Sequence, residues 1–365
     1  MIAPAALSLA ALLAAVVPAM ADQPDTSLRM NEVQVVGTHN SYKRELSGRE
    51  LTVQQRLDPG AANLAYSHAP LPQQFDGQTV RGLELDLFPD PEGGAYAHPL
   101  VRRMAGEPRL EGMDEPGIKV LHVADLDYAT TCRTLQLCLA QVRAFSEANP
   151  EHAPIPILLE LKSTDDRLEA AGGARSVPWD RDRLDALDAE IRAVFDEDDM
   201  ITPDDVRAGA ETLESAVLQD GWPSLDDARG QVVFLLDNDP GEIRDAYVAG
   251  RPNLEGAAVF TNSRPGLPDA AFVKRNEPLT QSAEITDLVR RGYYVRTRSD
   301  VPVRTVLADD PAMRDAAFAS GAQIISTDFP VPGMAARYDS DFVTSLPGGG
   351  ELRCNPVNAP QRCAR

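Results

Sequence analysis

Residues 83–88 read Leu-Glu-Leu-Asp-Leu-Phe, an apolar stretch that contains two acidic residues. Alternate side chains of a β-strand point to the same face, so Glu84 and Asp86 would share one face while Leu85 points to the other. Two carboxylates inside an apolar strand are costly to bury unless a partner compensates their charge. The stretch therefore predicts a central strand that presents paired acids to a functional site.

Seven other short apolar segments, mostly rich in β-branched residues, occur along the chain: 33–36, 118–123, 155–161, 232–236, 257–260, 293–297 and 323–327. Helical or polar stretches separate them, which is typical of a parallel sheet with crossover helices. The clearest helical patterns cover 132–148, 181–195 and 313–320. The pattern predicts an α/β fold. Eight such units, without a Gly-x-Gly-x-x-Gly turn after the first strand, favour a closed barrel over a Rossmann sheet, namely a TIM-type (β/α)8 barrel in a single domain.

The first 21 residues have the pattern of a signal peptide. The apolar run at 5–17 is too short to span a bilayer, and it is followed by Ala19-Met20-Ala21, a small-residue cleavage pattern. Because the run lacks a preceding Lys or Arg, an uncleaved anchor is the alternative. We expect a signal peptide at 1–21, the barrel at 22–345 and a tail at 346–365, in a protein that is secreted or periplasmic.

The chain contains four cysteines, which suit disulfides in an exported protein and allow three pairings. The local scheme pairs Cys132 with Cys138 and Cys354 with Cys363. Two residues six apart on one helix point to different sides, so Cys132 would have to precede its helix.

The formal net charge of −21 disfavours a nucleic-acid partner, because such binders present a basic face. Any attraction to an anionic substrate must therefore be local and come from a metal ion and a few cationic side chains.

The active site of a parallel barrel lies at the C-terminal ends of its strands. There the first four predicted strands supply two histidines, three carboxylates, one amide and one amine: His39, Asn40, Glu84, Asp86, His122, Glu160 and Lys162. Carboxylate and amide oxygens suit a hard cation, either Ca²⁺ or Mg²⁺. Asn40, Glu84, Asp86 and Glu160 therefore predict a metal site beside two histidines.

Later strand ends supply further candidates. Arg296 and Arg298 on the seventh predicted strand are both suited to bind phosphate, and we favour Arg298. Asp237 follows the fifth strand, where polar residues often cap a neighbouring loop. His68 lies in a loop and His152 in a polar turn, so both are expected at the surface.

The segment His39-Asn40-Ser41-Tyr42 resembles the His-Asn-x-Tyr signature of phosphoinositide phospholipase C barrels, and Leu83-Glu84-Leu85-Asp86 resembles their strand with Glu-Leu-Asp. The runs 121–127 and 158–162 resemble the bacterial, calcium-dependent branch of that family, as does Thr131-Cys132. The resemblance extends over roughly 31–330. Each motif is short, but four motifs in the expected order on successive strands are specific.

The resemblance implies a Ca²⁺-dependent enzyme, with Mg²⁺ as the alternative ion, that acts on a phospholipid substrate at a membrane surface. It would cleave phosphatidylinositol-type lipids to diacylglycerol and a cyclic inositol phosphate. The same resemblance implies His39 and His122 as catalytic residues and Lys162 and Arg298 as substrate-binding cations. Either His39 or a metal-facing carboxylate would take the proton of the attacking hydroxyl. We expect the enzyme to be a monomer.

Two other functions remain as hypotheses. The spacing Glu160-x-Lys162 is also similar to glycerophosphodiester phosphodiesterases, which share the barrel, although their first histidine is usually followed by Arg. A glycerophosphodiester or sphingomyelin-type phosphodiesterase is therefore the second hypothesis. The third is a barrel that binds anionic headgroups without turnover, which would give the two strand-end histidines no role.

Overall fold

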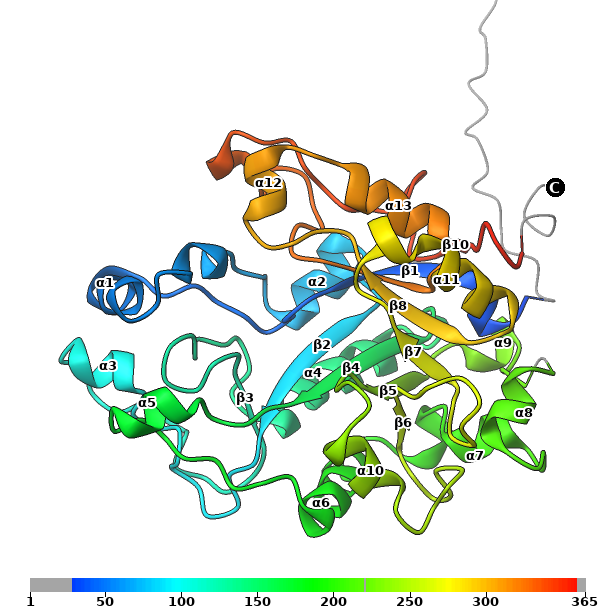
Figure 1. Ribbon diagram of the computed structural model, residues 1–365, viewed down its shortest axis with the longest axis horizontal. Coiled ribbons are helices and arrows are strands. Elements are labelled where there is room, and N and C mark those ends of the chain that lie inside the picture. Colours follow the sequence, from blue (N-terminus) through cyan, green and yellow to red (C-terminus); the bar gives the residue numbers. More distant parts are fainter. Residues whose placement is uncertain (1–27, 220, 360–365) are drawn as a thin grey trace, which may run out of the picture.

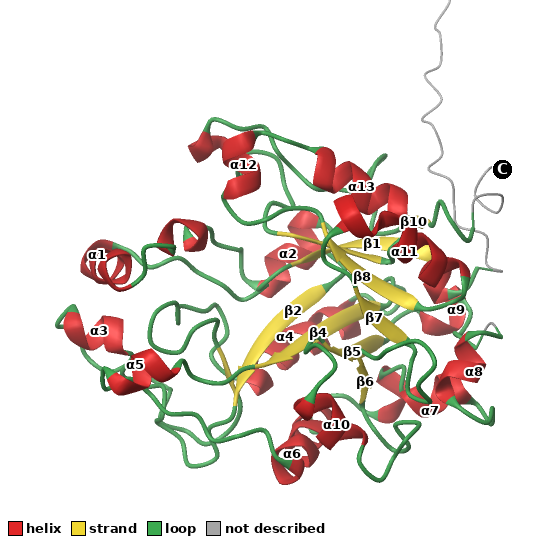
Figure 2. Ribbon diagram, viewed as in Figure 1, coloured by secondary structure: helices red, strands yellow, loops and turns green. Residues whose placement is uncertain are grey.

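The computed structural model describes residues 28–219 and 221–359, with strands at the centre and helices around them (Figures 1 and 2). The predicted signal peptide lies outside the described residues, as does Cys363. The described strands are β1 (Val33–Thr38), β2 (Leu83–Phe88), β3 (Lys119–Val120), β4 (Ile155–Leu161), β5 (Val232–Leu236), β6 (Val259–Thr261), β7 (Phe272–Lys274), β8 (Tyr294–Arg298), β9 (Ile324–Thr327) and β10 (Arg353–Cys354).

The strands of the described residues form two five-stranded sheets, ordered β10-β1-β9-β8-β7 and β3-β2-β4-β5-β6. Within each sheet the neighbours pair in parallel, except for the short edge strands β3 and β10, which are antiparallel to β2 and β1. Isolated parallel bridges join the two sheets, between Gly37 and Gly82 and between Asn262 and Phe272. The predicted parallel α/β fold is thus confirmed, whereas the described residues do not show a ring closed by continuous strand ladders.

Thirteen α-helices among the described residues accompany the strands. They are α1 (Gly48–Leu57), α2 (Leu71–Gln78), α3 (Leu100–Met104), α4 (Leu135–Ala148), α5 (Asp166–Ala170), α6 (Arg181–Arg192), α7 (Pro203–Arg207), α8 (Leu213–Val217), α9 (Leu225–Ala228), α10 (Glu242–Val248), α11 (Pro278–Arg290), α12 (Arg304–Ala308) and α13 (Ala312–Ser320). In the part of the chain that the structure describes, none of these helices combines the length and the apolar character that crossing a membrane requires.

The central strands are apolar because both of their faces are covered. Strand β5 is buried at every position, and β4 is buried at all but Glu160. Strands covered by side chains on both faces have near-continuous apolar sequences rather than alternating ones. An acidic residue on such a strand therefore occurs at a site where a partner compensates its charge.

The seam between β1 and β2 depends on two glycines. A Cβ atom at Gly37 would lie 3.0 Å from backbone atoms of Gly82, and one at Gly82 would lie 3.1 Å from Gly37 Cα. Glycine permits this close approach of two backbones. Across the seam, the amide of Thr38 donates to the carbonyl of Gly82 and the amide of Arg81 donates to the carbonyl of Val36.

The prediction of a parallel strand at 118–123 was wrong. The structure has only the two-residue β3 there, antiparallel to β2, and β4 pairs directly with β2 instead. Two described strands were not predicted, the two-residue β10 and β7, which has three residues and follows the turns at 265–269. A strand this short has no room for a period-two pattern, so its sequence carries little signal.

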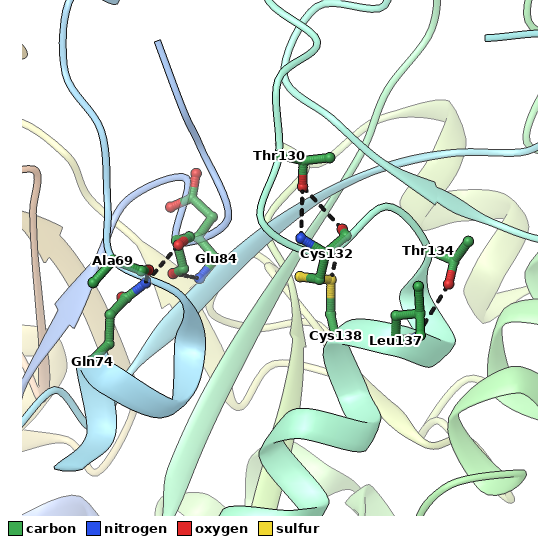
Figure 3. Close-up of a disulfide and its surroundings, with 9 residues drawn as sticks. Ala69, Gln74, Glu84, Thr130, Cys132, Thr134, Leu137 and Cys138 are labelled. Carbon is green, nitrogen blue, oxygen red and sulfur yellow. Dashed lines mark hydrogen bonds between the residues drawn. A yellow bond between two sulfur atoms is a disulfide. The ribbon is translucent and has the colours of Figure 1, made fainter. Parts of the chain in front are cut away.

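The three expected helices are present as α4, α6 and α13, and the predicted Cys132–Cys138 disulfide is confirmed. Cys132 lies before α4, whose N-cap is Thr134, and Cys138 lies within the helix (Figure 3). The disulfide therefore fixes the start of α4 to the loop that precedes it.

Candidate active site

Polar side chains gather where the parallel strands end, and the backbone places them directly. The amide of His39, immediately after β1, donates to the carbonyl of Thr327 on β9, at 3.0 Å. The amide of Ser41 donates to the carbonyl of Glu84 on β2, also at 3.0 Å. The segment after β1 is thus held between β9 and β2.

Four carboxylates lie on neighbouring strands. Asp86 on β2 is paired in register with Glu160 on β4, and Glu84 lies two residues before Asp86. Asp237 directly follows β5, and its amide donates to the carbonyl of Leu159 at 2.8 Å. One ligand oxygen each from Glu84, Glu160 and Asp237 lie within 4.8 Å of one another.

Three cationic side chains surround these acids. Arg296 of β8 donates to Glu84 at 2.5 Å. Lys162 Nζ lies 3.3 Å from Asp86 and 3.2 Å from Glu160. Lys274 of β7 forms a 3.1 Å ion pair with Asp237.

Burial and neighbouring charges shift the pKa values of the clustered acids. Burial raises the pKa of Glu84 to about 7 despite the ion pair with Arg296. Burial also raises the pKa of Asp86 well above its usual value. For Glu160 burial acts in the same direction, but the charges of Lys162 and Lys274 outweigh it and lower the pKa. Burial thus makes the ionised forms of Glu84 and Asp86 costly, and a nearby positive charge would favour those ionised forms.

The donor set fits a hard cation. Asp86 is fully buried, and Lys162 Nζ at 3.3 Å from Oδ2 is its ion-pair partner; neither oxygen accepts a hydrogen bond within the described structure. Asp237 Oδ1 likewise has no hydrogen-bond partner there. Buried carboxylate oxygens without donors are costly, and several such oxygens around one point suit Ca²⁺ or Mg²⁺.

Asn40, the fourth predicted ligand, is buried and has a left-handed backbone with φ of 50°. Its side-chain amide donates to the Tyr66 hydroxyl at 3.0 Å, and its Oδ1 accepts from the Tyr42 hydroxyl at 3.4 Å. These contacts fix the side chain at the end of β1. Its role as a metal ligand remains a prediction.

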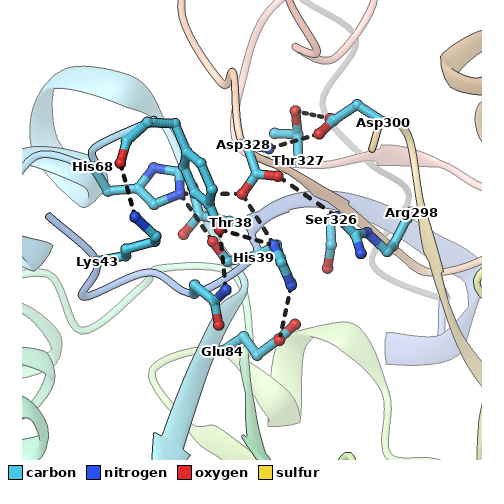
Figure 4. A network of polar contacts seen from close by, with 12 residues as sticks. Thr38, His39, Lys43, His68, Glu84, Arg298, Asp300, Ser326, Thr327 and Asp328 are labelled. Carbon is cyan, nitrogen blue, oxygen red and sulfur yellow. Dashed lines mark hydrogen bonds and ion pairs between the residues drawn. The ribbon is translucent and has the colours of Figure 1, made fainter. Parts of the chain in front are cut away.

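His39 is oriented by a carboxylate that follows β9. Its Nδ1 lies 3.0 Å from Asp328 Oδ1, and its Nε2 lies 3.6 Å from Glu84 Oε1 (Figure 4). Because a carboxylate only accepts hydrogen bonds, Nδ1 carries the proton and Nε2 is the free acceptor. Burial, followed by the charge of Arg298, lowers the pKa of His39 to about 3. The imidazole is therefore neutral and able to accept a proton.

Asp328 itself has a lowered pKa. Burial would raise it, but His39, His68 and Arg298 outweigh that effect. Arg298 NH2 lies 3.6 Å from Asp328 Oδ2, and in the described structure its Nε and NH2 have no hydrogen-bond acceptor (Figure 4). Arg298 thus has donors to spare, whereas Arg296 is fully buried and occupied by Glu84, Ser326 and Asn276.

His122 is held in the same way, by a carboxylate at its Nδ1. Its Nδ1 lies 2.8 Å from Asp127 Oδ2, and Lys43 Nζ lies 3.3 Å from the same oxygen. A short bridge between Val123 and Asp127 folds the chain back so that the carboxylate reaches the ring. His122 and Lys162 both line a cavity of about 260 Å³.

Sequence reasoning missed several of these residues. His68 was expected at the surface but is fully buried, and its Nε2 lies 2.9 Å from the carbonyl oxygen of His39. His152 was also expected at the surface but is buried against Ser146, away from this site. Asp237 belongs to the acidic cluster rather than to a loop cap alone, and Lys274 lies on β7, which was not predicted.

A family model described as "Phosphoinositide phospholipase C, Ca2+-dependent" matches residues 28–356. None of the curated proteins compared matches the chain.

Solved structures show the same fold. The calcium-dependent phosphoinositol-specific phospholipase C of Pseudomonas sp. superposes with a TM-score of 0.55 at 17% identity, over 92% of this chain and 99% of that one. The myo-inositol complex of the Pseudomonas enzyme gives a TM-score of 0.52 at 16% identity, with 90% and 96% covered. The Ca²⁺-dependent phosphatidylinositol-specific enzyme of Streptomyces antibioticus gives 0.52 at 18% identity, with 83% and 95% covered.

Proposed function

Because the chain belongs to the calcium-dependent phosphoinositide phospholipase C family, we propose that it cleaves phosphatidylinositol-type lipids to diacylglycerol and a cyclic inositol phosphate. The observation that carries this proposal is a pair of carboxylate-held imidazoles near the acidic cluster. His39 lies 3.6 Å from Glu84, and His122 lines a cavity together with Lys162, which pairs with Asp86 and Glu160. A bound myo-inositol in the Pseudomonas enzyme of the same fold supports an inositol headgroup.

We propose the following roles, which the contacts of the side chains support. His39 Nε2, the free acceptor, takes the proton of the inositol 2-hydroxyl as its oxygen attacks phosphorus. The bond between phosphorus and the glycerol oxygen breaks, and His122 gives a proton to that leaving oxygen. Asp127 stabilises the protonated form of His122 and Asp328 fixes the tautomer of His39, so both are positioning residues.

Glu84, Asp86 and Glu160, with Asn40 at the end of β1, would hold the calcium ion. When bound, the ion supplies positive charge that favours ionisation of the attacking hydroxyl and offsets charge on the phosphate. Arg298 offers its unpaired donors to the phosphate, and Lys162 reaches the cavity beside His122. The hydroxyl and the phosphorus belong to one substrate, so proximity supplies much of the rate.

The product of the reaction tests the proposal. Phosphatidylinositol, glycerophosphoinositol and sphingomyelin are incubated separately with the protein in Ca²⁺ or in EGTA, and phosphorus NMR follows the products. We expect a cyclic inositol phosphate from phosphatidylinositol, only with Ca²⁺. Cleavage of glycerophosphoinositol or sphingomyelin alone would favour the other phosphodiesterases, and binding without any product would leave a headgroup-binding barrel.

We also propose that the protein is secreted or periplasmic, with a signal peptide at 1–21, and that it works as a monomer at a phospholipid surface. The disulfide between Cys132 and Cys138 suits an oxidising compartment. Peptide sequencing of the exported protein, which should begin at Asp22, tests the cleavage site.

A further inference from the structure

Asp237 is an acid that the proposed ligand set does not contain. It is 3% exposed and lies at the end of β5, beside the strand that carries Glu160. Its Oδ2 pairs with Lys274 at 3.1 Å, whereas its buried Oδ1 has no hydrogen-bond partner in the described structure. Half of this carboxylate is therefore satisfied and half is available.

The distances suit a single ion. Ligand oxygens of Asp237, Glu84 and Glu160 lie within 4.8 Å of one another. Oxygens bound to one calcium ion at 2.3–2.6 Å lie at most about 5 Å apart. All three acids can therefore contribute to the same coordination sphere without moving the strands that carry them.

The local charge points in the same direction. Asp237, Glu84, Asp86 and Glu160 give four carboxyl groups, and the cations paired with them are Arg296, Lys162 and Lys274, so these described side chains include one more acid than paired cations. A bound cation would pair with the carboxylate that remains.

We propose that Asp237 contributes a ligand oxygen directly to the calcium ion, and that Lys274 holds the carboxylate in position. This inference rests on the proposed calcium centre and adds a ligand from the strand after Glu160. Asp239 provides a contrast, because it pairs with the same Lys274 at 3.4 Å but its side chain is 85% exposed. Asp239 thus pairs with Lys274 but does not belong to the acidic cluster.

Asp239 therefore gives the matched control. The full chain and the variants D237A, D237N and D239A are titrated with Ca²⁺ by calorimetry. In a second measurement Eu³⁺ replaces Ca²⁺, and its luminescence lifetimes in H2O and D2O count the water molecules bound to the ion. Circular dichroism and thermal melting establish that each variant folds, and D237N keeps the shape of the side chain if D237A does not fold.

We expect D237A and D237N to weaken Ca²⁺ binding about tenfold or more, and tenfold corresponds to about 1.4 kcal/mol. The Eu³⁺ ion bound to D237A should carry about one additional water molecule, because solvent fills a vacated position in the coordination sphere of such an ion. D239A should leave the affinity within twofold and the water count unchanged.

Two results would overturn the inference, and they are distinguishable. Ca²⁺ affinity and Eu³⁺ hydration of both Asp237 variants equal to those of D239A would remove Asp237 from the ion and leave the calcium centre standing. Failure of the unaltered chain to bind Ca²⁺ or Eu³⁺ would remove the centre itself.

Discussion

His39 follows a buried parallel strand, whereas His122 lies on a loop beyond the two-residue β3. Both rings bind a carboxylate through Nδ1, Asp328 in one case and Asp127 in the other. The surroundings differ, because Asp328 faces Arg298 and His68 while Asp127 faces Lys43. The same local arrangement is thus built on two different supports, one for each proposed proton transfer.

Replacing His39 with Ala should have the largest effect. We expect kcat on phosphatidylinositol to fall about a thousandfold, because a general base contributes about 10² to 10⁴. Turnover in mixed micelles at saturating Ca²⁺ gives the measurement, and Ca²⁺ affinity, which should change less than twofold, gives the control. A loss of less than tenfold would mean that a carboxylate takes the proton instead.

A substrate with a different leaving group distinguishes the proposed roles of His39 and His122. H122A should lose about 10² to 10³ in kcat on the lipid but less than about tenfold on p-nitrophenyl inositol phosphate, because nitrophenolate leaves without a proton. H39A should keep its deficit on both substrates. Equal losses of H122A on the two substrates would contradict its role as the acid.

Substitution of either positioning carboxylate, Asp328 or Asp127, should affect kcat in the same direction as substitution of the histidine that it holds. We expect D328N and D127N each to lower kcat about tenfold to a hundredfold, which matches the loss of a charge-assisted hydrogen bond of about 1.5–3 kcal/mol. The D127N deficit should shrink on the nitrophenyl substrate and the D328N deficit should not. The comparison fails if both variants respond alike to the leaving group.

The disulfide between Cys132 and Cys138 should stabilise the folded protein but have little effect on kcat. It closes a short loop of the unfolded chain, so C132A/C138A should lower the free energy of unfolding by about 2 kcal/mol. Urea titration gives this value, and kcat at 25 °C should change less than threefold. An unfolding curve that matches the unaltered chain would show that α4 packing alone holds the segment.

The prediction succeeded where residues lie on long strands. Glu84 and Asp86 stand out because acids interrupt an apolar run, and β2 and β4 have the predicted bounds. His122 was identified from its motif although its strand was wrong, because β3 turns back against β2 within two residues. A local apolar pattern does not reveal the direction in which a strand pairs.

The rest of the site depends on contacts between distant segments. His68 becomes a site residue only because its loop folds under His39, 29 positions away in the chain. Lys274 meets Asp237 across 37 positions, from a strand of three residues. Nothing near His68 or Lys274 in the sequence indicates its partner. Only the folded chain therefore shows that both residues belong to the site.

The glycine seam between β1 and β2 has a consequence for the spacing of the reacting groups. His39 follows Gly37 by two residues and Glu84 follows Gly82 by two, so both side chains project from backbone that runs on directly from the seam. A methyl group at either glycine would push β1 and β2 apart and increase the distance between the imidazole of His39 and the carboxylate of Glu84. Gly37 and Gly82 therefore help to set the distance between His39 and Glu84.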